Sequence, residues 1–134
     1  MIETKEIFTG SQCNNNCVFC KYEKEQRKER DAAEIKNELR EAKQHGIERI
    51  VFTGGNPLLR KDFNALLDYA HGLHFRWIGI ATNGRDFFRA KLVRIDSENK
   101  YFDESIKKII EKLNYFRILV CGADAAMHDA ITRS

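Results

Sequence analysis

The chain has 134 residues, which favours one domain of ordinary size over two. Its 43% hydrophobic content argues against wholesale disorder, and 23 basic residues nearly cancel 20 acidic ones, so the charge gives no indication of nucleic-acid binding. No apolar run approaches the roughly 18 residues that a membrane span needs. The first six residues are too charged for a signal peptide. We therefore expect a cytoplasmic protein.

Short apolar runs alternate with amphipathic helical patterns along the chain. The runs lie at residues 7–8, 50–52, 77–81 and 118–121. Each run is too short for a helix and does not alternate with polar residues. This is typical of strands that are buried on both faces of a parallel sheet.

The first helical pattern has clear signals at both ends. Asp31 is a candidate N-cap, with Glu34 as its partner in a capping box. Gly46 is placed to end the helix in the left-handed conformation. The apolar positions recur on one face, which should pack on the core: Ile35, Leu39 and Ala42.

Further helical patterns follow downstream. Asp62 can cap a second helix that stops near Gly72, and Asp103 can cap a third. A fourth begins near Asp124. The second and third patterns place apolar residues at i, i+3, i+4 and i+7: Phe63, Leu66, Leu67 and Ala70, then Ile106, Ile109, Ile110 and Leu113.

Strands that alternate with helices predict an α/β fold with parallel pairing and right-handed crossovers. A βα unit takes about 30 residues, so the chain accommodates about four units. A closed eight-unit barrel needs roughly 250 residues and is excluded. The sheet should therefore be open and curved, or part of a larger barrel. In both cases ligands should bind at the carboxyl ends of the strands.

Three cysteines follow the first strand at C-x3-C-x2-C spacing: Cys13, Cys17 and Cys20. Three thiolates on one short loop can point at one metal centre. A structural zinc site takes four ligands, and so does an ordinary electron-transfer [4Fe–4S] cluster. Three cysteines leave one coordination position open, as a reactive metal site requires. The alternative is three buried thiols that bind nothing.

This loop resembles the hallmark of the radical S-adenosylmethionine (SAM) enzymes, whose core is a partial (βα) barrel. The resemblance implies that Cys13, Cys17 and Cys20 hold three irons of a [4Fe–4S] cluster, while SAM chelates the fourth iron through its amino and carboxylate groups. Phe19 matches the aromatic residue that the family usually has just before the third cysteine, near the adenine. The alternative for Phe19 is packing within the loop.

A second motif, Gly54-Gly55-Asn56-Pro57, ends the second strand. Two glycines let the backbone bend sharply and approach a ligand closely, and their N–H and C=O groups can meet its polar end. Alone it would be only a turn. It resembles the family's Gly-Gly-Glu-Pro motif, which binds the amino group of SAM. Asn56 keeps a carbonyl acceptor for an ammonium group but lacks the charge of the commoner acidic residue.

A third motif, Thr82-Asn83-Gly84, ends the third strand. Thr82 and Asn83 offer hydroxyl and amide groups to a ribose or a carboxylate. The family often has Thr-Asn-Gly here, facing SAM. The alternative is simple turn or cap chemistry.

Residues 120–129 resemble the family's strand-four segment, which ends in a His-Asp pair. Cys121 stands where an aspartate is common. It is either a fourth metal ligand or, as we favour, a buried small hydrophobe. His128 is either a proton-transfer group or, as we favour, part of a helix cap.

The resemblance implies that a reduced cluster passes one electron into SAM, giving methionine and a 5′-deoxyadenosyl radical that abstracts a hydrogen atom from the substrate. It also implies a one-electron donor such as flavodoxin or ferredoxin. We therefore predict a radical SAM enzyme in which residues 1–134 form the N-terminal, incomplete part of the core. The sequence does not identify the substrate.

Radical SAM cores usually have six βα units, and this chain accommodates about four. An exposed edge at strand four favours a complementing chain or a homodimer that covers it. Two other classes remain open: a non-catalytic iron–sulfur-binding module and a degenerate interaction domain without metal.

Overall fold

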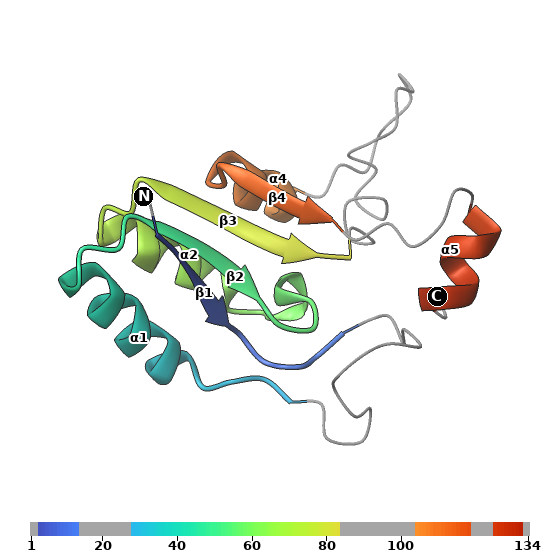
Figure 1. The fold of residues 1–134 in the computed structure, drawn as a ribbon, viewed down its shortest axis with the longest axis horizontal. Coiled ribbons are helices and arrows are strands. Elements are labelled where there is room, and N and C mark those ends of the chain that lie inside the picture. The colour runs from blue at the N-terminus through green and yellow to red at the C-terminus, as the bar shows by residue number, and fades with distance from the viewer. Residues whose placement is uncertain (1–2, 14–27, 84–103, 119–124, 133–134) are drawn as a thin grey trace.

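The computed structural model describes residues 3–13, 28–83, 104–118 and 125–132 (Figure 1). Four parallel strands form one sheet in the order β1-β2-β3-β4, which is also their order in the chain. This confirms the predicted α/β fold. The strands are β1 (Thr4–Phe8), β2 (Arg49–Thr53), β3 (Trp77–Thr82) and β4 (Tyr115–Ile118).

Helical segments connect or follow these strands: α1 (Ala32–Gln44), the 3₁₀ turn η2 (Pro57–Leu59), α2 (Phe63–Gly72), α4 (Glu104–Glu111) and α5 (Ala125–Thr132). Asp31 caps α1 as predicted, since its side chain accepts a hydrogen bond from the Ala33 N–H. Gly46 has a φ of +81°, which confirms the predicted left-handed end. No helix in the described part of the chain is long and apolar enough to cross a membrane.

Three local predictions were wrong. Asp62 occupies the N-cap position of α2 but makes no capping hydrogen bond, because its carboxylate binds Arg60 instead. The strands β1 and β4 both begin three residues before the apolar runs that predicted them. The first residues of β1, Thr4, Lys5 and Glu6, are polar and exposed, so no apolar signal marked them. In β4 the aromatic pair Tyr115-Phe116 did carry an apolar signal, but the polar Arg117 separates it from the apolar run at residues 118–121. Asp103 and residues 119–121 lie outside the described residues.

The core lies between one face of the sheet and the helices. The predicted core positions of α1 and α2 are all buried there, and they pack with strand residues such as Ile7, Phe52 and Ile80. Phe52 and Phe63 meet edge to face, with ring centroids 5.3 Å apart. Of the predicted core positions in the third helix, Ile109 is buried and Ile110 and Leu113 are partly buried.

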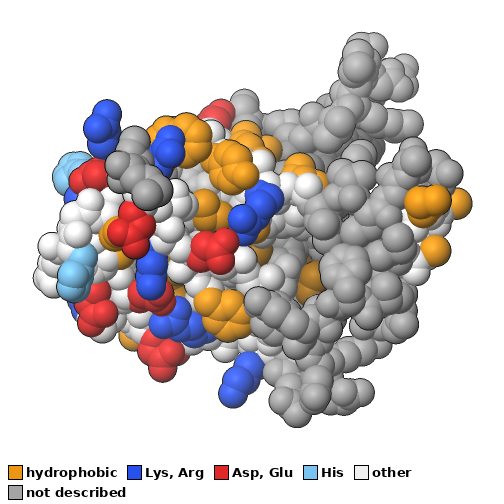
Figure 2. Space-filling view, viewed as in Figure 1, with side chains coloured by type: hydrophobic (Ala, Val, Ile, Leu, Met, Phe, Trp, Pro, Cys, Tyr) orange, Lys and Arg blue, Asp and Glu red, His pale blue; other side chains and the backbone are white. Residues whose placement is uncertain are grey.

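The other face of the sheet, the open face, is only partly covered in the described residues. The prediction of burial on both faces is confirmed at the centre of β2, where Ile50, Val51 and Phe52 are all buried, and was wrong for β1 and β4, whose residues on this face are exposed. Phe8, Trp77 and Tyr115 on this face are 38%, 40% and 38% exposed. Figure 2, drawn from the same side as Figure 1, shows hydrophobic side chains interspersed with acidic and basic ones.

One ion pair spans the open face. The Glu6 carboxylate on β1 lies 3.0 Å from the Arg117 guanidinium on β4. In a flat sheet these outer strands would be about 14 Å apart, since neighbouring strands are spaced by about 4.8 Å. Two side chains bridge this distance more readily when the sheet curls toward them. The ion pair therefore agrees with the curvature of a partial barrel.

Candidate functional site

The three predicted motifs meet at the carboxyl edge of the sheet, where β1, β2 and β3 end. A chain of hydrogen bonds joins one residue from each of the first two motifs to two residues of the third. Thr82 Oγ1 donates to Asn56 Oδ1 at 2.9 Å, and Asn56 Nδ2 donates to Asn83 Oδ1 at 3.3 Å. Asn83 Nδ2 in turn lies 3.5 Å from Cys13 Sγ. Residues more than 25 positions apart in the chain thus form one connected polar group.

The glycine turn after β2 is seated directly on the segment that leads to Cys13. Gly55 N–H donates to the Gly10 carbonyl at 3.0 Å, and Asn56 N–H donates to the Gln12 carbonyl at 2.6 Å. A Cβ at Gly54 would lie 2.2 Å from Gly10 O, and one at Gly55 would lie 2.2 Å from Gln12 O. Glycine is required here for backbone-to-backbone packing. The N–H groups of Gly55 and Asn56 are thereby occupied. Of the glycine N–H and C=O groups that were expected to meet a ligand, the Gly55 N–H is therefore used within the fold.

The Asn56 side chain is buried, with 2% of the residue exposed. Its Oδ1 accepts from Thr82 Oγ1 and from the Leu58 N–H, at 2.9 and 3.3 Å. A carbonyl oxygen has two lone pairs, so these two donors use its acceptor capacity. Asn56 therefore positions its neighbours. Pro57, which follows it, is also buried. Contact of Gly54, Gly55, Asn56 or Pro57 with SAM stays a prediction, as it does for Thr82 and Asn83.

The two ends of the cysteine-bearing segment are joined at its base. Ser11 N–H donates to the Lys28 carbonyl at 2.8 Å, and Lys28 N–H donates to Ser11 Oγ at 3.0 Å. Gly10 and Glu29 form an antiparallel bridge beside them. These contacts hold the position at which the segment leaves and rejoins the sheet edge.

Arg60 is a structural residue of this site that the sequence did not reveal. Its side chain is 4% exposed. The guanidinium donates to the carbonyls of Thr9 and Arg30 at 2.9 and 2.5 Å, and in bidentate fashion to Asp62, with both distances 2.8 Å. It therefore ties the exit of β1 to the entry of α1. Its place three residues after Pro57, with an acidic partner two positions on, gave no indication of this role.

The pKa of Asp62 is lowered by the hydrogen bonds from Arg60, which outweigh the partial burial that would raise it. A carboxyl with a lowered pKa stabilises the folded state above its unfolded pKa, at about pH 4, and this contribution is lost as the pH falls through the folded pKa. We expect an NMR titration of the Asp62 carboxyl to give a lower midpoint in the folded chain than in the urea-unfolded chain. An equal or higher folded midpoint would contradict this.

Several predicted residues cannot be placed. Cys17, Cys20, Phe19 and Cys121 lie outside the described residues. Within the described ranges no group of three His, Cys, Asp or Glu side chains could hold a metal ion, and Cys13 is the one predicted ligand found there. His128 lies inside α5, which begins at Ala125, so its predicted role in starting a helix was wrong.

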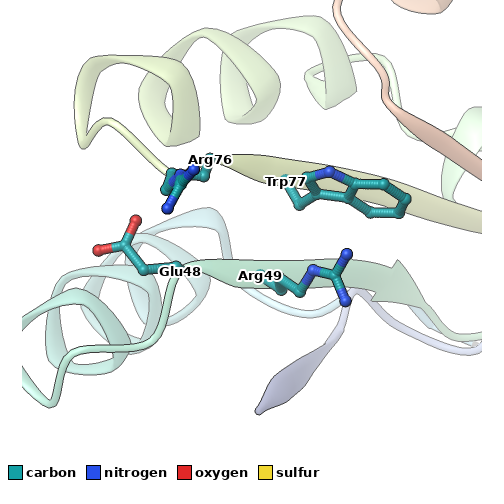
Figure 3. A pocket seen from close by; sticks show the side chains of 4 residues that line it. All are labelled: Glu48, Arg49, Arg76 and Trp77. Atoms are coloured by element: carbon teal, nitrogen blue, oxygen red, sulfur yellow. The ribbon is translucent and has the colours of Figure 1, made fainter. Parts of the chain in front are cut away.

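A pocket lies at the opposite end of the sheet (Figure 3). It is lined by residues at the amino ends of β2 and β3: Glu48, Arg49, Arg76 and Trp77. The Arg49 guanidinium stacks 4.3 Å from the centre of the Trp77 ring. The Arg49 guanidinium is thus already in contact with the Trp77 ring. None of the three predicted motifs lies at this edge of the sheet.

Comparison with known proteins decides the family. The family model described as the Radical SAM superfamily matches residues 7–131, nearly the whole chain. The chain belongs to the radical SAM superfamily. The resemblance drawn from the motifs is therefore confirmed, and the hydrogen-bonded motifs occupy the strand ends where a radical SAM core is expected to bind its cofactors.

Named relatives include enzymes of this superfamily. A "Probable GTP 3′,8-cyclase" of Methanopyrus kandleri is 31% identical over an alignment of 144 residues, which covers 98% of this chain and 45% of the relative. An "S-adenosylmethionine-dependent nucleotide dehydratase" of Selenomonas ruminantium is 26% identical over 113 residues, covering 84% of this chain and 40% of the relative. This radical SAM chain thus spans less than half the length of both.

A solved structure supports the fold. Streptococcus suis SuiB, bound to the precursor peptide SuiA, superimposes with a TM-score of 0.68. The alignment covers 96% of this chain and 26% of that one, at 21% sequence identity. The likeness shows that this chain shares its fold with part of that structure.

Proposed function

We propose that this chain carries the cluster and SAM site of a radical SAM enzyme. Cys13, Cys17 and Cys20 would hold a [4Fe–4S] cluster, and the residues at the ends of β2 and β3 would hold SAM. When bound, these groups supply reductive cleavage of SAM to a 5′-deoxyadenosyl radical, which abstracts a hydrogen atom from the substrate. The main supporting observation is that residues from all three motifs join the same hydrogen-bonded group in a chain of this family.

The residues that the structure describes fit such a cluster. Cys13 is half-buried beyond the end of β1, at the edge of the sheet where the motifs meet. An amide N–H of Asn83 is directed at this sulfur, and hydrogen bonds of this kind stabilise thiolate ligands. The joined ends at Ser11 and Lys28 fix where the cysteine-bearing segment begins and ends.

The test is anaerobic reconstitution with iron and sulfide, followed by EPR of the reduced protein with and without SAM. We expect a [4Fe–4S]⁺ signal that changes when SAM is added, and four irons per chain. Cys13→Ala should abolish the signal, because two cysteines do not hold the cluster. Cys121→Ala is the matched cysteine variant, and we expect it to keep the signal.

Other outcomes point to the alternative classes. A cluster whose signal ignores SAM indicates an iron–sulfur module that does not turn over by itself. A folded chain that loads no iron, with all its cysteines intact, overturns the proposal and leaves an interaction domain. Loss of the cluster in Cys121→Ala would make this cysteine a fourth ligand and leave no iron open for SAM.

We propose a nucleotide as the first substrate to test. The support is the names of the two relatives, which refer to GTP and to a nucleotide. The assay measures 5′-deoxyadenosine released from SAM with dithionite as electron donor, with GTP present or absent. Stimulation by GTP supports the proposal, and equal release without it argues for another substrate. A one-electron donor protein, and a partner or second copy along β4, also remain predictions.

A further inference from the structure

We propose that Asn83 tunes the reduction potential of the cluster through a hydrogen bond to Cys13, and that Asn56 is the positioning residue that aims the Asn83 amide. This inference rests on the proposed function, because it requires a cluster at Cys13. It assigns to Asn56 and Asn83 a role toward the sulfur ligand that is separate from any contact with SAM.

The orientation of both amides follows from one backbone group. The Leu58 N–H can only donate, so the Asn56 atom that it meets at 3.3 Å must be the carbonyl oxygen. Thr82 Oγ1 donates to the same oxygen at 2.9 Å. The Asn56 amide nitrogen therefore points the other way.

The next step fixes Asn83 in the same manner. The Asn56 amide nitrogen donates to an Asn83 atom at 3.3 Å, which must then be the Asn83 carbonyl oxygen. The Asn83 amide nitrogen is left facing Cys13 Sγ at 3.5 Å. The side chain therefore presents an N–H donor to the sulfur, not an oxygen lone pair that would repel it.

An acidic residue at position 56 could not do this. A carboxylate accepts from Leu58 and Thr82 but has no N–H to donate to Asn83. The asparagine in the Gly-Gly-Asn-Pro motif is thus what orders the chain of donors that ends at Cys13. Compared with an acidic residue, Asn56 lacks a negative charge but has an N–H that donates to Asn83.

A donor at a ligand sulfur acts on the redox couple by electrostatics. The cluster gains one electron on going from [4Fe–4S]²⁺ to [4Fe–4S]⁺, and the added negative charge is partly carried by the sulfurs. A nearby N–H dipole stabilises the reduced form more than the oxidised form and raises the potential. Removing it should lower the potential.

The experiment is a redox titration with dithionite, followed by EPR, on the reconstituted chain without SAM. Omitting SAM removes any effect of an Asn83–SAM contact. Asn83→Leu is close in size and neutral, so it deletes the donor without adding charge. We expect the ratio of reduced to oxidised cluster to fall by on the order of tenfold at a fixed potential, which is about 59 mV for a one-electron couple.

The positioning role is tested by a double-mutant cycle. Asn56→Ala should lower the potential in the same direction as Asn83→Leu. In the Asn83→Leu background it should have no further effect, because it acts through that side chain. The matched control is Asn37→Ala on the exposed surface of α1, which should leave the potential unchanged.

The outcomes separate this inference from the proposed function. If the unmodified chain loads no cluster, the proposed function itself fails. If it loads one and Asn83→Leu leaves the potential unchanged, only the tuning role is overturned. Additive shifts of the two variants would overturn the positioning role of Asn56.

If Asn83→Leu does not fold, Asn83→Ser replaces it, because the serine hydroxyl is too short to reach the sulfur. Loss of loading in both folded variants would indicate a role in binding rather than tuning and would overturn the inference.

Discussion

Gly55→Ala is expected to destabilise the fold by more than about 4 kcal/mol, a loss that single substitutions cause only by a severe local conflict. The new Cβ would lie 2.2 Å from Gln12 O and 2.6 Å from Ser11 O, and both are backbone atoms. Relief requires that the glycine turn separate from the segment that leads to Cys13. This breaks the hydrogen bonds from Gly55 N–H and Asn56 N–H. Iron loading should be lost with them.

Gly72→Ala is the matched control for this prediction. Gly72 is the last residue of α2, and an added Cβ would meet no atom within 4 Å. Alanine favours a helix by up to about 1 kcal/mol over glycine, so this variant should be neutral or slightly more stable. Urea unfolding followed by circular dichroism measures both. A Gly55→Ala midpoint equal to that of Gly72→Ala would show that the two segments do not pack as described.

Arg60→Met is expected to cost about 2–4 kcal/mol, since it leaves buried hydrogen-bond acceptors without their charged donor. The Arg30 carbonyl and the Asp62 carboxylate both lose the guanidinium, and the Thr9 carbonyl keeps only the Arg30 N–H. Asp62 is 40% exposed, so water takes over part of its solvation and limits the cost.

The design of this test uses two further arginine variants. Arg60→Lys keeps the charge but cannot reproduce the planar fork, so its loss of stability should lie between those of the native chain and Arg60→Met. Arg76→Met removes an exposed guanidinium and should change stability by less than about 0.5 kcal/mol. The readout is the urea midpoint at constant slope. Equal midpoints for Arg60→Met and Arg76→Met would refute the clamping role of Arg60.

The sequence predicted the parts of the fold that periodicity governs. Apolar spacing marked the buried face of α1, and Asp31 and Gly46 marked its ends. It failed where one side chain has two partners to choose from. Asp62 has the spacing of an N-cap, but the buried Arg60 competes successfully for its carboxylate. Local propensity contains no information on that competition.

The candidate site was predictable in position but not in its contacts. Parallel strands bring their carboxyl ends to one edge, so Cys13, Asn56 and Asn83 had to be neighbours. Whether the nitrogen or the oxygen of the Asn83 amide faces the sulfur depends, through Asn56, on the Leu58 N–H. The direction of this backbone donor is set by the η2 turn. Likewise, the two glycines gave the expectation of a close ligand approach. What approaches Gly55 is the backbone of Gln12.

The order of the strands has a consequence for how the chain acquires its structure. Each described strand pairs with the strand that precedes it in the chain, and none is inserted between two others. During synthesis from the N-terminus, β2 finds β1 already made, and β3 and β4 each find a ready edge. The sequence separation of the main contacts stays short for a parallel sheet, which favours rapid folding. The sheet can therefore grow on the ribosome one βα unit at a time.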